Sequence, residues 1–401
     1  MDKLKELNPK TIPECNIGTL GHVSHGKTSL VASLTGKITL THSEELKRGI
    51  TIRLGYADVA IYKCVKCSRY SAINKCPYCF SDAEIMRTIS FVDAPGHETL
   101  MATVLTGASL LDGVLFVIAA NEKCPQPQTK EHLYVLEIAG IKNAVIIQNK
   151  IDLVSEERAL KSYEEIKEFV KGSILEEAPV IPVSAQYKTN IDVVLEAIQK
   201  FIPTPNRDEL KEPKMLVARS FDINKPGTRP TKLVGGILGG AIIFGKFSLG
   251  ERIEIRPGVK IGNKYQPLFT KVIGLQKAGK NIDVANTGGL LGMMTTLDPS
   301  LTKSDSLVGN VVGLPDKLPE SRETISMNVK FLNRVDTAVK VNETILINVG
   351  TARSIGIVTT FKKEIMEIKL KIPVCVDEKE KVAISRQIDG RWRLVGYGII
   401  A

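Results

Sequence analysis

The chain of 401 residues has 54 Lys and Arg against 44 Asp and Glu, a formal net charge of +10, and is 43% hydrophobic and 24% charged. This balance is ordinary for globular proteins and excludes bulk disorder, a collagen-like chain and a coiled coil. No stretch approaches 18 uninterrupted apolar residues, and the polar start at 1–13 has no signal-peptide core. We therefore expect a cytoplasmic protein with no membrane partner.

The positive charge is concentrated in the second half of the chain. Residues 1–200 hold 23 basic and 24 acidic residues, whereas residues 201–401 hold 31 and 20. A basic surface attracts phosphate backbones, but this excess is also compatible with an ordinary solvated surface. Charge alone therefore leaves nucleic-acid binding open.

Up to about residue 205, short apolar runs alternate with amphipathic stretches of helical period. We predict strands at 16–21, 88–93, 113–120, 144–148 and 180–183, and helices from Lys27 and at 100–111, 129–139, 156–170 and 191–201. Continuous apolar strands that alternate with helices are typical of a doubly wound, mainly parallel α/β sheet.

The segment 202–208, with prolines at 203 and 205, predicts a linker. After it come short strands rich in Val, Ile, Thr and Gly, a texture typical of antiparallel β-barrels. A second boundary is predicted at 315–322, and about six strands follow it. The predicted domains are an α/β domain over 1–206, a β-barrel over 207–320 and a second β-barrel over 321–401.

A phosphate-binding loop is predicted at 21–28, because the residues fit G-x-x-x-x-G-K-[ST]. They read Gly21, His22, Val23, Ser24, His25, Gly26, Lys27 and Thr28. Backbone N–H groups of such a loop surround phosphates, Lys27 adds a positive charge and the Thr28 hydroxyl binds Mg²⁺. A glycine turn with a surface lysine is the alternative, and the strand before the loop and the helix after it disfavour that alternative.

Three further motifs follow in the order that a guanine nucleotide site requires. Asp93 ends a predicted strand and can hold Mg²⁺ through water, and the Gly96 N–H can meet the γ-phosphate. In the N-K-x-D run, Asp152 can accept hydrogen bonds from guanine N1 and N2, donors that adenine lacks. Together with the phosphate-binding loop, the motifs predict a GTPase that hydrolyses GTP to GDP. The residues predicted to surround the base are Asn149, Lys150, Asp152, Ser184, Ala185 and Gln186.

Two residues near the γ-phosphate are predicted to have different roles, one in a switch and one in catalysis. Thr51 follows Arg48-Gly49-Ile50 and can reach Mg²⁺ only when the γ-phosphate is present, which predicts an order–disorder switch. His97 can orient, or relay a proton from, the attacking water. An exposed histidine at a helix start is the alternative for His97. Structural or surface positions are expected for His22, His25, His42 and His132.

Four cysteines form two C-x-x-C pairs, separated by eight residues, in an insertion at about 62–82. Two such pairs supply the four thiolates of a tetrahedral zinc site, which leaves no open position and is therefore structural. Two unrelated pairs in a reducing cytosol are the alternative, and a redox role is less favoured. The ligands would be Cys64, Cys67, Cys76 and Cys79, whereas Cys15, Cys124 and Cys375 are isolated in the sequence.

The GHVxHGKT, RGITI and DAPGHE motifs resemble those of translational GTPases related to elongation factor Tu. Four features narrow the resemblance to the γ subunit of archaeal and eukaryotic translation initiation factor 2. They are the THSEELKRGITI run, the cysteine insertion, the KLVGG…GG segment at 232–240 and the terminal AISRQIDGRWRLVGYGII.

The resemblance, which covers essentially the whole chain, implies a GTP-binding domain followed by two β-barrels. It also implies that the GTP-bound protein carries methionylated initiator tRNA to the small ribosomal subunit. The partner α subunit would dock on the second domain and the β subunit on the first. An elongation-type or selenocysteine-type aminoacyl-tRNA carrier is the alternative.

One position departs from the family pattern. The family has Asp within the phosphate-binding loop, and this chain has Ser24. The resemblance implies a second metal ion near that Asp and the backbone of Gly49. We expect Thr28 and Thr51 to hold the principal Mg²⁺, and the second ion at Ser24 and Gly49 is placed in doubt by the lost negative charge.

Overall fold

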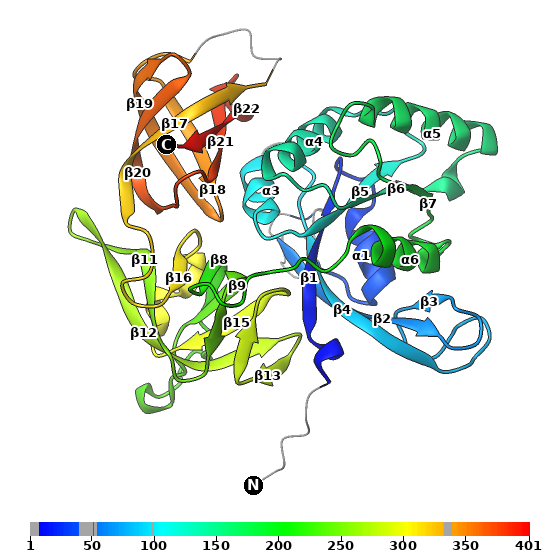
Figure 1. The fold of residues 1–401 in the computed structure, drawn as a ribbon, viewed down its shortest axis with the longest axis horizontal. Coiled ribbons are helices and arrows are strands. Elements are labelled where there is room, and N and C mark those ends of the chain that lie inside the picture. Colours follow the sequence, from blue (N-terminus) through cyan, green and yellow to red (C-terminus); the bar gives the residue numbers. More distant parts are fainter. Residues whose placement is uncertain (1–7, 40–50, 52–53, 98–99, 333–338) are drawn as a thin grey trace. The chain divides into compact units, whose positions relative to one another are not determined.

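The structure is a computed structural model that describes residues 8–39, 51, 54–97, 100–332 and 339–401. The chain divides into two compact units, Met1–Pro205 and Asn206–Ala401 (Figure 1). Within the described residues, no helix is both long enough and apolar enough to span a membrane.

A seven-stranded sheet with the order β3-β2-β4-β1-β5-β6-β7 forms the centre of the first unit. Strands β4, β1, β5, β6 and β7 run parallel, and β2 and β3 add an antiparallel edge. The prediction of a mainly parallel α/β sheet is confirmed. The strands are β1 (Pro13–Leu20), β2 (Gly55–Cys64), β3 (Tyr70–Ser71), β4 (Ala83–Asp93), β5 (Gly113–Ala119), β6 (Ala144–Asn149) and β7 (Val180–Pro182).

Helices cover both faces of this sheet (Figure 1). Helices α1 and α6 pack against each other and share a buried core with the sheet, in which Leu30 and Ile198 meet Ile17 and Val117. Helices α3, α4 and α5 lie on the opposite face. The helices are η1 (Pro9–Thr11), α1 (Lys27–Thr35), α3 (Met101–Ala108), α4 (Pro127–Ala139), η3 (Ile151–Leu153), α5 (Glu156–Val170) and α6 (Ile191–Phe201).

The second unit begins with an antiparallel barrel. Six strands follow the order β11-β16-β8-β9-β15-β12, and β12 pairs with β11 to close the ring. Its core includes Phe247 and Met293, both fully buried. The elements are β8 (Lys214–Phe221), η4 (Pro230–Lys232), β9 (Ile237–Phe244), β10 (Lys246–Ser248), β11 (Arg252–Ile261), β12 (Lys264–Lys277), β13 (Lys280–Ile282), β14 (Val284–Asn286), β15 (Leu291–Thr295), η5 (Pro299–Leu301), η6 (Lys303–Asp305) and β16 (Val311–Gly313).

A second closed barrel, with the order β17-β20-β19-β18-β21-β22, completes the chain. Its separate core includes Met327 and Ile347. Two antiparallel β-barrels after an α/β domain are therefore confirmed as the fold class. The strands are β17 (Ser321–Phe331), β18 (Thr344–Val349), β19 (Ala352–Lys362), β20 (Ile365–Cys375), β21 (Lys381–Ile388) and β22 (Arg391–Ile400).

Candidate guanine nucleotide and metal sites

The predicted nucleotide motifs lie at the carboxyl ends of β1, β4, β6 and β7. Because these strands are parallel, their carboxyl ends meet at one edge of the sheet, where α/β folds bind ligands. The register pairs Thr19 of β1 with Asp93 of β4. The fold therefore brings loops that are about 160 residues apart in sequence to one site.

The phosphate-binding loop has a backbone that requires its glycines. Gly21 has φ +140°, and a Cβ there would lie 2.1 Å from the carbonyl oxygen of Val117. Gly26 has φ +88°, and its Cβ would lie 2.3 Å from Asn149 Nδ2. Neither position can accept a side chain without a shift of the neighbouring groups. The positive φ angles and the lack of space for a Cβ therefore explain why the motif has glycine at its first and sixth positions.

Lys27 lies folded back over the same loop. Its Nζ donates hydrogen bonds to the carbonyl oxygens of Gly21 at 3.0 Å and His22 at 2.8 Å. Burial lowers the pKa of Lys27 to about 8, although the nearby Asp93 carboxylate acts in the opposite direction. Burial disfavours the charged form of the Lys27 amine. An anionic phosphate in the loop would favour that charged form and so raise the pKa of Lys27.

Asp93 is the centre of a buried cluster of oxygen atoms. Its Oδ2 accepts hydrogen bonds from the hydroxyls of Thr28 and Thr39, both at 2.7 Å, and lies 3.5 Å from Thr51 Oγ1. Its Oδ1 accepts from Thr19 at 2.8 Å. Sequence analysis did not predict Thr19 or Thr39; only the strand register and the fold bring them to this carboxylate.

The donor set around Asp93 fits Mg²⁺. This ion takes oxygen ligands at about 2.1 Å in octahedral geometry, which separates adjacent ligands by about 3.0 Å. Thr28 Oγ1 and Thr51 Oγ1 lie 2.9 Å apart. Ser24 is exposed, with φ +62°, at the mouth of this region. Gly49, the other predicted contributor to a second ion, lies outside the described residues, as do His42 and the rest of the run 40–50.

A pocket joins the phosphate-binding loop to the switch residues. His97 is exposed and lines this pocket beside Gly96, where a Cβ would lie 2.3 Å from Lys27 Nζ. Ser29, which directly follows the motif, was not predicted, although its place at the start of α1 is a usable signal. The lining residues are Val23, Ser24, Gly26, Lys27, Thr28, Ser29, Thr51, Gly96, His97 and Lys150.

The guanine motif is tied to the phosphate-binding loop by Asn149. Its Nδ2 donates to the carbonyl oxygen of His25 at 2.9 Å, and its Oδ1 accepts from Ala185 N at 3.1 Å. Asn149 is 2% exposed and so acts as a buried strut between three loops. Asp152 lies exposed on η3, available to a base, and Lys150 precedes it with φ +63°.

The remaining residues of the base loop differ in exposure. Ser184 and Ala185 are buried, and Ser184 Oγ accepts from Tyr187 N at 3.3 Å. Gln186 is exposed. Of the three residues predicted for the base loop, only Gln186 therefore has an exposed side chain.

The histidines of the loop turn inward, away from the pocket. His25 is 1% exposed; its Nδ1 lies 3.2 Å from the Val117 carbonyl, and its Nε2 lies 3.5 Å from Glu122. Burial lowers the pKa of His25 to about 4, so the ring is neutral and Nδ1 carries the proton that it donates to Val117. Burial also lowers the pKa of His22.

His132 of α4 contacts the start of the phosphate-binding loop at Gly21. It is fully buried, and its Nδ1 accepts a 2.8 Å hydrogen bond from the backbone N–H of Gly21. Desolvation holds the pKa of His132 well below its ordinary value, so the ring is neutral with its proton on Nε2. Nothing in the sequence marks this residue as part of the site, because the link forms only when α4 packs beside the loop.

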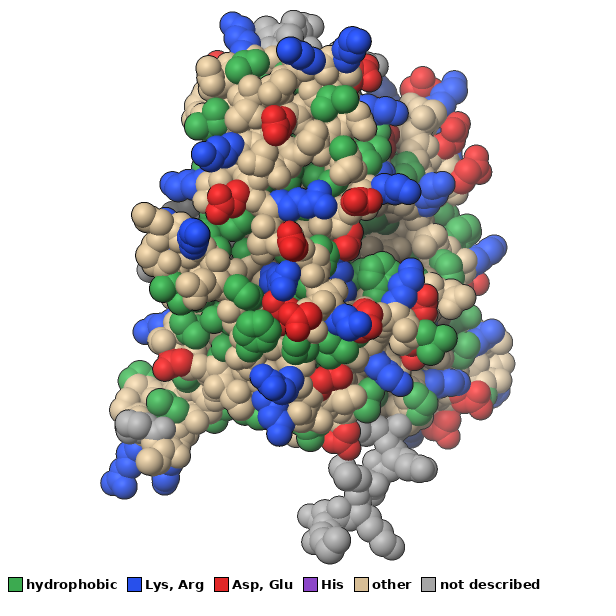
Figure 2. Space-filling model, turned by 60° about the vertical axis from the view of Figure 1, so that its left-hand side comes forward, with side chains coloured by type: hydrophobic (Ala, Val, Ile, Leu, Met, Phe, Trp, Pro, Cys, Tyr) green, Lys and Arg blue, Asp and Glu red, His purple; other side chains and the backbone are tan. Residues whose placement is uncertain are grey.

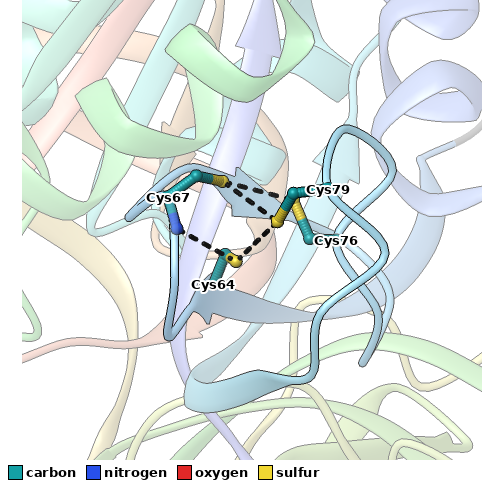
Figure 3. Close-up of side chains that lie close together, drawn as sticks. All are labelled: Cys64, Cys67, Cys76 and Cys79. Carbon is teal, nitrogen blue, oxygen red and sulfur yellow. Dashed lines mark hydrogen bonds between the residues drawn. The ribbon is translucent and has the colours of Figure 1, made fainter.

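The four clustered cysteines converge in the hairpin between β2 and β4 (Figure 3). Their four sulfur atoms all lie within 4.8 Å of one another. Tetrahedral Zn–S bonds of about 2.3 Å would separate the sulfurs by about 3.8 Å, and the closest pairs are Cys64–Cys79 at 3.4 Å, Cys67–Cys76 at 3.4 Å and Cys67–Cys79 at 3.7 Å.

Backbone groups of the hairpin support these sulfurs. The N–H groups of Lys66 and Cys67 each donate to Cys64 Sγ at 3.4 Å. Hydrogen bonds from Ser81 lower the pKa of Cys79 to about 6. Donated N–H groups favour the thiolate that binds metal, so the donor set fits zinc. The three isolated cysteines are each buried at separate places, namely Cys15, Cys124 and Cys375.

Comparison with known proteins agrees with this geometry. The family model for the elongation factor Tu GTP binding domain matches residues 13–204, and that for the C-terminal domain of initiation factor eIF2 gamma matches residues 323–400. Two solved structures share the fold. A bacterial selenocysteine-specific elongation factor has a TM-score of 0.76 at 24% identity, covering 97% of this chain, which spans 58% of that protein. Elongation factor SelB of Methanococcus maripaludis, in complex with the GTP analogue GppNHp, has a TM-score of 0.74 at 21% identity. The match covers 97% of this chain and 79% of SelB.

Curated relatives are much closer in sequence than these structures. Translation initiation factor 2 subunit gamma of Pyrococcus horikoshii is 55% identical over 399 residues, which cover 96% of this chain and 97% of the relative. The protein of the same name from Methanocaldococcus jannaschii is 56% identical with the same coverage. An elongation-type carrier is not favoured. At this identity over nearly its whole length, the chain belongs to the translation initiation factor 2 subunit gamma family and is a GTP-hydrolysing enzyme of translation initiation.

Proposed function

We propose that this chain is a GTP-gated carrier of methionylated initiator tRNA, which it delivers to the small ribosomal subunit. The observation that carries the proposal is the contact of Thr51 with Thr28 and Asp93. It links the end of the predicted switch segment to two residues suited to the nucleotide's Mg²⁺. A γ-phosphate would hold this contact, and its loss would release the segment that precedes Thr51.

In this proposal the chain's own residues position GTP for attack by water. The loop N–H groups and Lys27 would bind the phosphates. Thr28 and Thr51, with Asp93 acting through water, would hold Mg²⁺, which would supply positive charge to offset the developing phosphate charge. His97 orients the attacking water from the rim of the pocket. Ser24 offers a neutral hydroxyl where a carboxylate would hold a second ion, so we expect weak binding there.

Base selection falls to the second half of the site. Asp152 would accept two hydrogen bonds from guanine, and Asn149 would keep its loop in place through His25 and Ala185. Lys150, Ser184 and Gln186 complete the proposed base-binding set. Adenine would leave Asp152 without these donors and would bind more weakly.

We also propose that the four cysteines hold a structural zinc ion. Four thiolates complete its coordination, so the ion would stabilise the hairpin and take no part in GTP hydrolysis. Metal analysis of the purified chain should give one zinc per molecule, and Cys67→Ser with Cys79→Ser should abolish it while GTP turnover persists. A wild-type chain that binds no zinc at micromolar concentration would refute this assignment.

Initiator tRNA and the α and β subunits of a heterotrimer are the proposed partners. The proposal of these partners rests on the family, and the basic second half of the chain agrees with a tRNA partner without establishing it. On the face drawn in Figure 2, Lys and Arg side chains are interspersed with Asp and Glu. Charge therefore marks no single tRNA surface on that face.

Binding of methionylated tRNA in two nucleotide states tests the gating. With the α subunit supplied, the chain loaded with a non-hydrolysable GTP analogue and Mg²⁺ should bind the tRNA, and the GDP-loaded chain should not. A Thr51→Ala variant should reduce this difference, whereas a Thr11→Ala control outside the site should retain it. Equal binding in both nucleotide states would refute the gating.

A further inference from the structure

The cysteine hairpin, residues 62–82, exposes an unusual number of large apolar side chains. Phe80 is 80% exposed, Val65 60%, Ile73 55% and Tyr78 50%. A small hairpin held by a metal needs no exposed aromatic rings for its own stability. Clustered exposed apolar groups mark interaction sites on soluble proteins, so these side chains call for a partner.

Phe80 is strained as well as exposed. Each knuckle closes when a backbone N–H donates to the carbonyl oxygen of the first cysteine of its pair, Ser68 to Cys64 at 3.1 Å and Phe80 to Cys76 at 3.0 Å. These bonds hold Ser68 at φ +60° and Phe80 at φ +58°. Glycine adopts this conformation freely, and bulky residues rarely do. Neither the turn nor packing therefore explains the ring at position 80.

The second aromatic side chain is already arranged for stacking. The Arg69 guanidinium lies 4.2 Å from the centre of the Tyr78 ring, and Arg69 Nη1 lies 4.0 Å from Asp192 Oδ2 of α6. Arg69 thus covers the Tyr78 ring from a position that Asp192 helps to fix. With half of the Tyr78 side chain exposed, an aromatic ligand could stack on it.

Charge complementarity favours a polyanion. Residues 62–82 contain four basic residues and one acidic residue, whereas the rest of residues 1–200 contain 19 basic and 23 acidic. A zinc tetrathiolate, at −2, would still leave the hairpin at +1. Lys66 and Lys75 are both exposed, and neither forms an ion pair within the described part of the chain. The hairpin is therefore a basic point on an otherwise acidic domain.

We propose that the cysteine hairpin is an RNA-binding surface, on which Phe80 and Tyr78 stack against unpaired bases while Lys66 and Lys75 contact phosphates. Stacking on aromatic rings and phosphate contacts from basic side chains are the two means by which proteins hold single-stranded RNA. A translation initiation GTPase works among RNA molecules, and its tRNA and the small ribosomal subunit both offer unpaired loops.

A pair of glycine variants separates binding from folding. Phe80→Gly removes the ring and relieves the positive φ, whereas Ser68→Gly relieves the same strain and removes no ring. In the full-length, GDP-loaded chain, both should retain zinc and melt at or above the wild-type temperature. Fluorescence anisotropy with a labelled 20-nucleotide oligouridylate should show at least fivefold weaker binding for Phe80→Gly, from the loss of one stacked base. Ser68→Gly should bind like the wild type.

The lysines are tested by salt dependence. Lys66→Ala with Lys75→Ala should lower the slope of log Kd against log salt by about 1.4, because each phosphate contact in single strands contributes about 0.7. The control pair Lys142→Ala and Lys171→Ala, exposed elsewhere on the same unit, should leave the slope unchanged.

Two further titrations identify the source of the RNA. If Phe80→Gly weakens binding of labelled initiator tRNA, the hairpin contacts tRNA; if it weakens binding of small ribosomal subunits instead, the hairpin contacts ribosomal RNA. Oligouridylate binding that is equal for Phe80→Gly and Ser68→Gly overturns the proposal, even if subunit binding falls, because that pattern would indicate a protein contact. Zinc content, measured on the same samples, tests the zinc assignment independently of RNA binding.

Discussion

Replacement of His132 by Leu tests whether the hydrogen bond from Gly21 to His132 holds the phosphate-binding loop in place. His132 is fully buried and its Nδ1 accepts the Gly21 N–H at 2.8 Å. Leucine cannot accept this bond, and a buried donor without an acceptor costs about 1–3 kcal/mol. If the loop shifts to recover a partner, its N–H groups leave the phosphates. We therefore expect a loss of about 5- to 150-fold in GDP affinity.

The assay is the dissociation rate of a fluorescent GDP analogue, measured with the melting temperature of each variant. His132→Asn is the matched control, because its Oδ1 can accept near the position of Nδ1, and it should recover most of the affinity. Equal GDP dissociation from the Leu variant and the wild type would refute the reasoning. Equal losses in the Leu and Asn variants would show that the imidazole acts through packing alone.

Four further predictions concern the same site. Gly26→Ala places a Cβ 2.3 Å from Asn149 Nδ2 at φ +88°; strain of about 1–2 kcal/mol and a lost hydrogen bond of about 1 kcal/mol should lower GDP affinity at least tenfold in the same assay. Asp152→Asn should exchange preference for GTP for preference for XTP, as measured by competition; unchanged preference would exclude Asp152 as the base reader. Burial lowers the pKa of Lys27 from 10.5 to about 8, so between these pH values the unfolded chain keeps a proton that the folded chain has released. The stability attributable to this group is therefore present above pH 10.5 and is lost as the pH falls through 8. Phosphate should raise this pKa, so calorimetry in two buffers should detect proton uptake on GDP binding at pH 9 and little at pH 7, and Lys27→Arg should remove the difference. Ser24→Asp should speed intrinsic GTP turnover if a carboxylate at that position assists hydrolysis, and unchanged turnover would contradict that role.

Much of the fold could be predicted because the parallel strands are continuous apolar runs with turn residues at their ends. Helices α5 and α6 occupy the predicted ranges 156–170 and 191–201. Strand β2 was not predicted because it is an antiparallel strand, paired with β3 and β4. Its buried and half-buried positions alternate, which gives a weaker signal than a run buried on both faces. Its partner β4 likewise begins five residues before the predicted strand.

The nucleotide motifs were readable because each is contiguous in sequence and ends a strand. The residues that hold these motifs in place could not be predicted from the sequence, because each acts through a contact between distant segments. His132 reaches Gly21 over 111 positions, and Thr19 reaches Asp93 over 74. A histidine or threonine inside a regular element carries no local mark of such a role. The sequence also did not predict that Phe80 is exposed, because its exposure depends on how the cysteine hairpin folds.

Selective binding of initiator tRNA is the most direct test of the proposed carrier role. The chain, with the α subunit supplied and Mg²⁺ present, is titrated against methionylated initiator tRNA and methionylated elongator tRNA, each with a non-hydrolysable GTP analogue and with GDP. We expect tight binding of the initiator tRNA alone, and only with the GTP analogue. Equal binding of both tRNAs, or binding that is indifferent to the nucleotide, would contradict the account.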